Sequence, residues 1–473
     1  MKYFVDGFRF PLNVEESKIK STIRDRLSIG SRSFRYEPCF KKVVYDASKK
    51  KAFLECAFSV ETSSYIKDTS ISFLPELTEP SYKKMSFPNG LAVVGSSFSA
   101  LLFALILVKQ GIKTTLLAPA DSIDSKRRLS GTYIYFPKPT GNEEAESILR
   151  EFLPDKVGIR GGLVILSSKE HASLIDSMVE KFQRLGGVLS YKSQPLFISM
   201  FLGKMRKLIY QCDKVEKEEK FDRIIMMDQG ATGAFYQSIK AKKTKSDPRI
   251  RIYIESKKKD VDSLFYENLL RLPLHFSSRT ITSKSGVKVD VHYPMVDCAL
   301  RNYGAHSAEP IPGLTFVSDK RRVGALTSLE VSLSSMEELD STLASCRRLN
   351  LPGCVPCQKV SDFLVRKESF RLGGVKSSYS DGVYLDNFHS LLPAAASDAF
   401  QSCIWKIKEE VPYLSPDALL IGVEPVIRPG EVSIPSRYAQ YVKAYWDKQS
   451  YTLDLVAQCG FVFDSLKDFF DYA

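Results

Sequence analysis

The sequence is poor in histidine and tryptophan and has no long apolar run. Five His and two Trp in 473 residues leave little material for a histidine metal site, and we expect no metal. The longest apolar run, 101–108, is eight residues. That is far short of the ~20 residues that span a bilayer, so we expect no membrane partner. The first residues lack a continuous apolar segment, and we expect no secretory signal.

The cysteine count indicates a cellular compartment, whereas the net charge excludes no class of ligand or partner. The nine Cys are odd in number and scattered, which indicates free thiols in a reducing cytoplasm rather than a disulfide framework. The net charge of +12 permits an anionic ligand or partner without requiring one. With 44% hydrophobic and 26% charged residues, the composition is that of a folded protein of several domains.

Residues 1–86 predict a small N-terminal α+β domain. The segments 34–44 and 52–60 are typical of strands on either side of a polar turn, and 14–27 has a helical mix of polar and apolar residues. The stretch 74–80 has the composition of a linker.

A Rossmann-like, doubly wound α/β sheet is predicted to begin after this linker. Leu91–Val94 is a short buried strand, 99–110 is a helix, and Thr114–Leu117 is a second buried strand. This βαβ order opens a parallel sheet. We assign 87–249 to the first part of a dinucleotide-binding domain.

The remaining chain predicts an insertion and a return. Residues 250–350 are richer in β-type residues and turns, which indicates an inserted α+β domain that would cap a substrate. We expect the chain to return to the sheet domain over 351–473. Within that return, Ala394–Glu410 and Ser465–Tyr472 are predicted helices.

The turn after the first predicted strand has part of a dinucleotide-binding pattern. The complete pattern is Gly-x-Gly-x-x-Gly, followed about 20 residues later by an acid for the ribose. Here the turn reads Gly95-Ser96-Ser97-Phe98-Ser99-Ala100, so only the first glycine remains. Ala118 stands where the acid is expected. A helix N-terminus still attracts a pyrophosphate; the alternative is a βαβ unit that packs and binds nothing.

These segments resemble the flavin-binding start of the FAD-dependent dehydrogenase family. The resemblance covers Val93–Leu101 and Gly111–Leu117, and it continues in order through 254–266, 356–364 and 377–424. It implies an NAD(P)/FAD-dependent oxidoreductase with a small N-terminal domain. It also implies that residues 95–100 hold the FAD pyrophosphate and that a segment containing Gly460 closes over the flavin. Two basic residues follow the second strand closely enough to reach a pyrophosphate, namely Arg127 and Arg128.

Several positions depart from the family pattern. Ser97 replaces the second glycine, Ala118 replaces the strand-end acid, and the segment around Gly460 has lost most of its glycines. A Cys-containing segment of the inserted domain is also missing near His292, where the chain offers instead Tyr293, Asp297 and Arg301. Each replaced glycine adds at least a Cβ. Because protein interiors are densely packed, these added atoms would occupy space where the flavin lies in the family. We therefore predict that side chains narrow the cleft between the inserted domain and the sheet domain.

Two further patterns leave alternatives open. Cys354 and Cys357 form a CxxC pair, which is either a redox dithiol or part of a Pro-rich turn. A basic stretch with interleaved aromatics either follows a nucleic-acid backbone or is a solvated face. It contains Lys240, Lys242, Lys243, Lys245, Arg249, Arg251 and Lys257–Lys259, near Tyr236 and Tyr253.

Three functions follow from the sequence. The first is an FAD-dependent oxidoreductase that takes a hydride from a nicotinamide or another small-molecule substrate. The second is a pseudoenzyme that keeps the fold as an interaction scaffold for a protein partner. The third is a basic, nucleic-acid-associated protein. The sequence names no catalytic residue, because in flavoproteins the cofactor supplies most of the chemistry.

Overall fold

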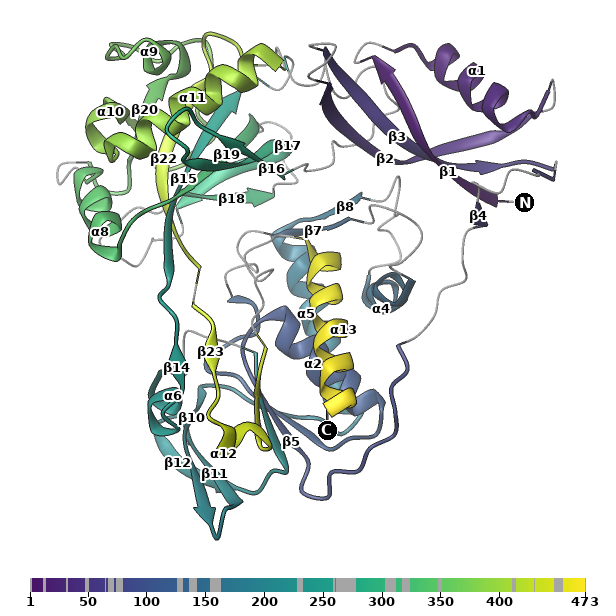
Figure 1. The fold of residues 1–473 in the computed structure, drawn as a ribbon, viewed down its shortest axis with the longest axis vertical. Coiled ribbons are helices and arrows are strands. Elements are labelled where there is room, and N and C mark those ends of the chain that lie inside the picture. The colour runs from purple at the N-terminus through teal and green to yellow at the C-terminus, as the bar shows by residue number, and fades with distance from the viewer. Residues whose placement is uncertain are drawn as a thin grey trace.

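In a computed structural model, the described part of the chain forms an N-terminal unit, a parallel sheet with its covering layers, and a second, larger sheet (Figure 1). The structure describes residues 2–11, 14–30, 33–46, 51–63, 65–66, 72–73, 80–125, 131–135, 143–153, 163–227, 233–257, 260, 278–302, 312–316, 324–347, 351–410, 414–428, 430–445 and 454–472.

The N-terminal unit is an antiparallel sheet with one helix packed on it. Its strand order is β2-β3-β1-β4. The helix buries Ile19, Ile23 and Leu27, which lie one turn apart and so share the face that meets the sheet. The elements are β1 (Lys2–Pro11), α1 (Glu16–Leu27), β2 (Arg35–Asp46), β3 (Lys51–Glu61) and β4 (Ser72–Phe73).

The second unit is a five-stranded parallel sheet, which confirms the predicted Rossmann-like class. Its order is β9-β6-β5-β13-β24, so in order along the chain the strands lie 3-2-1-4-5, as in the first five strands of a Rossmann sheet. The central strand is buried on both sides, which explains its continuous apolar sequence. The strands are β5 (Leu91–Val94), β6 (Thr114–Leu117), β9 (Val188–Ser190), β13 (Arg223–Met226) and β24 (Val442–Ala444).

Helices cover one face of this sheet (Figure 1). They are α2 (Phe98–Lys109), α4 (Glu143–Phe152), α5 (Ser168–Arg184) and α13 (Leu455–Tyr472), beside the pair β7 (Thr132–Tyr135) and β8 (Leu163–Leu166). Every residue of α2 from 98 to 108 is buried, because α5 and α13 pack around it. Within the described ranges, each helix is too short or too polar to cross a membrane.

A small antiparallel meander covers the opposite face, where long helices would complete a fully wound sheet. Alternation along β5 divides its side chains between the two layers, since Leu91 and Val93 meet the helices while Ala92 and Val94 meet the meander. This layer contains β10 (Ser193–Phe201), β11 (Lys204–Cys212), β12 (Val215–Glu219), α6 (Gly233–Ser238) and α12 (Ser436–Ala439).

The third unit is a mostly antiparallel sheet of order β16-β17-β19-β15-β22-β20-β21, with β18 paired to β17. Its strands are β15 (Asp247–Ser256), β16 (Ser278–Thr282), β17 (Lys288–Asn302), β18 (Pro312–Phe316), β19 (Gly324–Ser332), β20 (Val355–Lys359), β21 (Val383–Leu385) and β22 (Leu419–Arg428). The helices on one face are α8 (Met336–Ser345), α9 (Val360–Leu364), α10 (Phe388–Leu391) and α11 (Ala394–Glu410), whose bounds match the predicted helix.

The chain returns to the parallel sheet later than predicted. Strands from both sides of residue 350 share the third unit, because β22 pairs with both β15 and β20. The predicted return at 351 is therefore wrong, and the insertion extends over 247–428. The chain rejoins the parallel sheet at β24, after two connecting strands that pair with each other, β14 (Lys242–Lys243) and β23 (Val432–Ser433).

The final helix is longer than predicted. We expected it to begin at Ser465, yet α13 begins at Leu455. The Asp454 carboxylate accepts a hydrogen bond from the Val456 amide at 3.0 Å and so caps the helix. Buried residues then recur every three to four positions, at Leu455, Cys459, Val462 and Leu466.

Candidate functional site

The dinucleotide turn lies where the predicted site requires it. Gly95 follows β5 and α2 begins at Phe98, so the turn sits at the carboxyl end of the central strand. The first amides of α2 and the helix dipole favour an anion there. Phe98, Ser99 and Ala100 are buried, whereas Ser96 and Ser97 are half-buried. A ligand that approaches the turn would therefore meet the two serines first.

Both serines already bind neighbouring backbone. Ser97 Oγ accepts a hydrogen bond from the Ala100 amide at 3.3 Å and acts as the N-cap of α2. Ser96 Oγ accepts from the Ala120 amide at 2.9 Å, and the Ser96 carbonyl accepts from the Asp124 amide at 2.6 Å. The loop after β6 thus packs against the turn. Ser97 also accepts the hydrogen bond from one of the α2 amides that would otherwise be free to bind an anion.

No acid replaces the missing ribose ligand within the described residues at the end of β6. Ala118 is fully buried, and its amide and carbonyl bind Ser190 and Ser193. Asp121 is exposed, while the Asp124 carboxylate binds Nε2 of the buried His171 at 3.0 Å. Gly95 and the α2 N-terminus are thus the residues that would hold the pyrophosphate of FAD, whereas the described residues at the end of β6 lack the strand-end carboxylate that the family pattern has for the ribose.

Of the other three predicted cofactor residues, the structure describes only Gly460. Arg127 and Arg128 lie outside the described residues. Gly460 lies in the second turn of α13 on its exposed side, and no atom beyond its own helix lies within 4 Å of where a Cβ would stand. The side chains of Tyr293, Asp297 and Arg301 are also outside the described part, so the narrowed cleft stays a prediction.

A charged network covers the face of the third unit that points away from its helices. Alternation along β15 turns Ile250, Ile252 and Ile254 to the helices, and it turns Arg249 and Arg251 to the other face. At the centre is Glu330 of β19, only 1% exposed. Its oxygens accept hydrogen bonds from three guanidinium groups, at 3.0 Å from Arg249, 2.8 Å from Arg251 and 2.6 Å from Arg428.

The network sets unusual protonation states on this face. Burial raises the pKa of Glu330, but the arginines outweigh it and hold that pKa at about 2. Burial and the charge of Arg251 lower the pKa of His292 to about 4, so its imidazole is neutral at neutral pH. Tyr253 donates to Glu424 at 2.5 Å. An imidazole with so low a pKa is a weak base at neutral pH, so it can form a hydrogen bond to a substrate but holds a proton poorly.

A second buried carboxylate, Glu255, lies on β15, the strand that also contributes Arg249 and Arg251. Glu255 is 1% exposed, and both its oxygens accept from the Ser378 amide, at 3.0 and 2.9 Å. Burial outweighs these hydrogen bonds and raises its pKa to about 7. Burial and Glu255 together raise the pKa of the Cys357 thiol to about 12, so the half of the CxxC pair on β20 is a poor thiolate. Cys354 and Cys357 are both free thiols in this structure.

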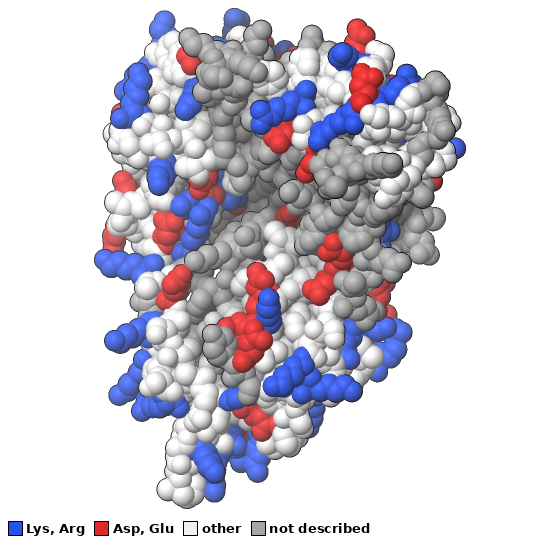
Figure 2. Space-filling model, turned by 45° about the vertical axis from the view of Figure 1, so that its right-hand side comes forward, with Lys and Arg blue, Asp and Glu red and all other residues white. Residues whose placement is uncertain are grey.

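The described part of the basic stretch does not favour the nucleic-acid alternative. Arg249 and Arg251 belong to the buried network, and Tyr236 and Tyr253 are buried and so cannot stack on bases. Lys257 lies 3.6 Å from the Asp417 carboxylate, and Lys258 and Lys259 lie outside the described residues. Figure 2 shows acidic and basic side chains intermixed on the face in view.

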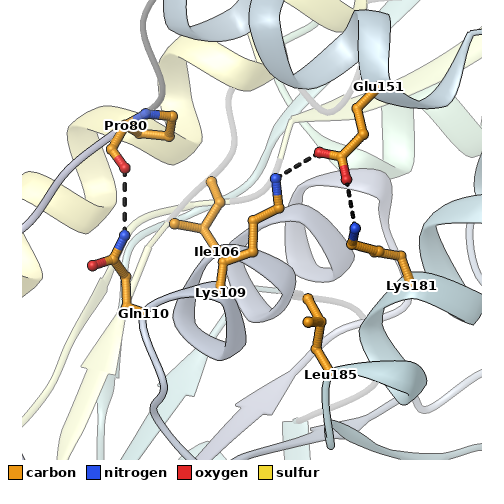
Figure 3. Close-up of a pocket in the computed structure, with 7 residues that line it drawn as sticks. All are labelled: Pro80, Ile106, Lys109, Gln110, Glu151, Lys181 and Leu185. Atoms are coloured by element: carbon orange, nitrogen blue, oxygen red, sulfur yellow. Dashed lines mark hydrogen bonds and ion pairs between the residues drawn. The ribbon is translucent and has the colours of Figure 1, made fainter.

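A pocket of about 300 Å³ lies at the opposite end of α2 from the turn (Figure 3). Lys109 of α2 and Lys181 of α5 both reach Glu151 of α4, at 2.5 and 3.0 Å. Burial raises the pKa of Glu151, yet the lysines hold it below its ordinary value. Because its charges are already paired across three helix ends, we interpret this pocket as a structural junction.

The comparisons with known proteins agree with the sequence resemblance. Residues 336–426 match the family described as FAD-dependent protein, C-terminal domain-like. This stretch contains α8 to α11 and most of β22, so it lies in the third unit. The match confirms the resemblance to FAD-dependent proteins and supports FAD as the cofactor. No curated protein matches the chain.

The comparison with solved structures finds flavoproteins at low similarity. A triple mutant of the flavin-dependent brominase Bmp2 has a TM-score of 0.38 at 12% identity, over 82% of this chain and 81% of that chain. A ternary complex of aklavinone-11 hydroxylase with FAD and aklavinone has a TM-score of 0.36 at 9% identity, over 81% of this chain and 61% of that chain. Both scores are low, and neither likeness bears on activity.

Sequence reasoning missed the charged network and Glu255. The signal was present in residues 249–255, where Arg, Arg, Tyr and Glu alternate with three isoleucines. That period of two predicts a strand with one apolar and one polar face. We instead grouped the arginines with the preceding lysines because they share a charge.

Proposed function

We propose that this protein is an FAD-dependent oxidoreductase that acts on a small molecule or a nicotinamide. The observation that carries the proposal is the family match over 336–426. The parallel sheet, with its 3-2-1-4-5 order, adds support because that order places a ligand crevice at the carboxyl end of β5.

In this proposal, Gly95 and the N-terminus of α2 hold the pyrophosphate. FAD, when bound, supplies the two-electron chemistry. The charged face of the third unit would orient a polar substrate, and the neutral imidazole of His292 would form a hydrogen bond to it. A cytoplasmic location remains a prediction.

Spectroscopy of the purified protein tests the proposal most directly. We expect absorbance near 450 nm, roughly where oxidised flavin absorbs, either as purified or after incubation with FAD and removal of excess. We also expect the bound flavin to be bleached by a reductant. A colourless protein that takes up no FAD would overturn the proposal.

A scaffold without flavin is the second candidate, and the closed turn favours it. Ser96 and Ser97 bind their own backbone, and Ala118 offers no ribose ligand. Such a protein would keep the fold for a protein partner.

Restoring the family residues distinguishes the two candidates. The double variant Ser97→Gly and Ala118→Glu removes the Cβ at the turn and adds a carboxylate for the ribose. We expect its dissociation constant for FAD to fall by about 10- to 100-fold, because a hydrogen bond to a charged group contributes ~1.5–3 kcal/mol. Flavin fluorescence quenching measures the constant.

The control is Ser97→Gly with Ala118→Gln, which adds similar volume without the charge. It should bind FAD no more tightly than the wild type. Equal affinities for the wild type and the Glu variant would show that the lost residues do not limit flavin binding.

A further inference from the structure

The turn between β10 and β11 exposes apolar side chains at the end of the molecule. Phe201 and Leu202 are 54% and 86% exposed. Phe201 pairs with Lys204, so Leu202 and Gly203 form a two-residue turn at the tip of the hairpin. The hairpin projects from the meander at the lower end of Figure 1, and in Figure 2 that end is mostly white with basic side chains beside it.

The fold itself does not require a leucine at this tip. Leu202 has φ +47° and Gly203 has φ +74°, the two positive values of a type I′ turn. Such turns favour Asn-Gly, because a larger side chain is strained in the left-handed region. Leu202 is thus both strained and exposed, so neither the turn nor the core accounts for it.

Basic side chains surround the tip and are not neutralised. Lys204 and Arg206 follow the turn on β11, and the Arg206 guanidinium lies 4.4 Å from the centre of the Phe201 ring. Tyr441, which follows α12, donates to the Gly203 carbonyl at 3.3 Å and so ties the hairpin tip to the segment before β24. Within the described part of the chain, Lys204 and Arg206 form no ion pair.

We propose that this hairpin tip docks onto an anionic lipid surface. Leu202 and Phe201 would enter the boundary of the acyl chains, while Lys204 and Arg206 would face the anionic headgroups. A convex, projecting tip with unpaired cations complements a fluid, negatively charged surface and offers a protein partner no groove. The docking is peripheral and needs no spanning helix, so it departs from our expectation of no membrane partner, which rested on the length of the apolar runs alone. It is independent of flavin binding.

Co-sedimentation with vesicles tests the proposal. We expect the full-length protein to sediment with phosphatidylcholine vesicles that contain phosphatidylserine, and less as salt rises. We expect little binding to pure phosphatidylcholine. Leu202→Asn should weaken vesicle binding by roughly 10-fold or more, because it removes an apolar side chain that would be buried among the lipids. Lys204→Gln with Arg206→Gln should weaken it by about 5-fold for each charge.

Leu202→Asn also separates docking from folding. Because asparagine tolerates positive φ, the melting temperature of the Leu202→Asn variant should equal or exceed that of the wild type. The matched control is Phe370→Ser, which changes an 89% exposed aromatic residue in the third unit and should leave vesicle binding unchanged. Vesicle binding that is unchanged in both Leu202→Asn and the Lys204→Gln/Arg206→Gln variant would overturn the proposal. So would a self-association that Leu202→Asn abolishes without vesicle binding, since it would assign the tip to a second copy of this chain.

Discussion

Replacing Glu330 with alanine should lower the free energy of unfolding of the third unit by about 3–5 kcal/mol, since it leaves three guanidinium groups without their shared carboxylate. Glu330 is 1% exposed, so water cannot easily take its place. Differential scanning calorimetry measures the effect, because it resolves the transitions of separate units. We expect the transition of the third unit to fall by roughly 10 °C.

The control for this variant is Glu368→Ala, at an exposed acid of the same unit. Its transition should match that of the wild type. If both variants melt together with the wild type, the network contributes no net stability.

We also expect Glu330 to make the stability of the third unit depend on pH in the acid range. Its pKa is about 2 in the folded protein, below the ordinary value of 4.5, so its ionised form is stabilised by folding. That stability is present above pH 4.5 and is lost as the pH falls toward 2. In Glu330→Gln, this part of the acid sensitivity should be absent.

Glu255→Gln should remove a pH dependence of opposite sign. The folded pKa of Glu255, about 7, lies above its ordinary value of 4.5, so folding favours the protonated form. The folded state then binds more protons between pH 4.5 and 7, and stability falls as the pH rises through this window. A shift of this size corresponds to about 3 kcal/mol.

Thermal melts from pH 4.5 to 7.5 measure this effect. The wild type should lose stability across the window, and Glu255→Gln should lose much less. Glu368→Gln should keep the wild-type slope. A Glu255→Gln variant with the full wild-type slope would assign the dependence to other groups.

The sequence predicted best what depends on neighbours along the chain. The βαβ unit of β5, α2 and β6 and the bounds of α11 follow from local periodicity, caps and glycines, all visible in a short window. The resemblance then identified the cofactor class, because family segments keep their order and spacing.

The errors arose where long-range pairing decides the structure. β15 takes its partners from β19 and β22, which lie far along the chain, so no local window shows that residues before and after 350 share a sheet. The same pairing places Arg249 beside Glu330, which turns a cation in a basic run into part of a buried network. The start of α13 was obscured because we assigned residues 454–460 to a flavin-covering loop.

Because β14 pairs with β23, the chain enters and leaves the third unit at adjacent positions. Lys242 lies opposite Ser433 and Lys243 opposite Val432, so the two ends of residues 244–431 leave the parallel sheet side by side. A segment whose ends are adjacent is exchangeable as a block, because its replacement need not move the strands on either side. The sequence of the third unit is therefore able to diverge independently of the parallel sheet, since the described connections between the two units run side by side as a two-stranded ribbon.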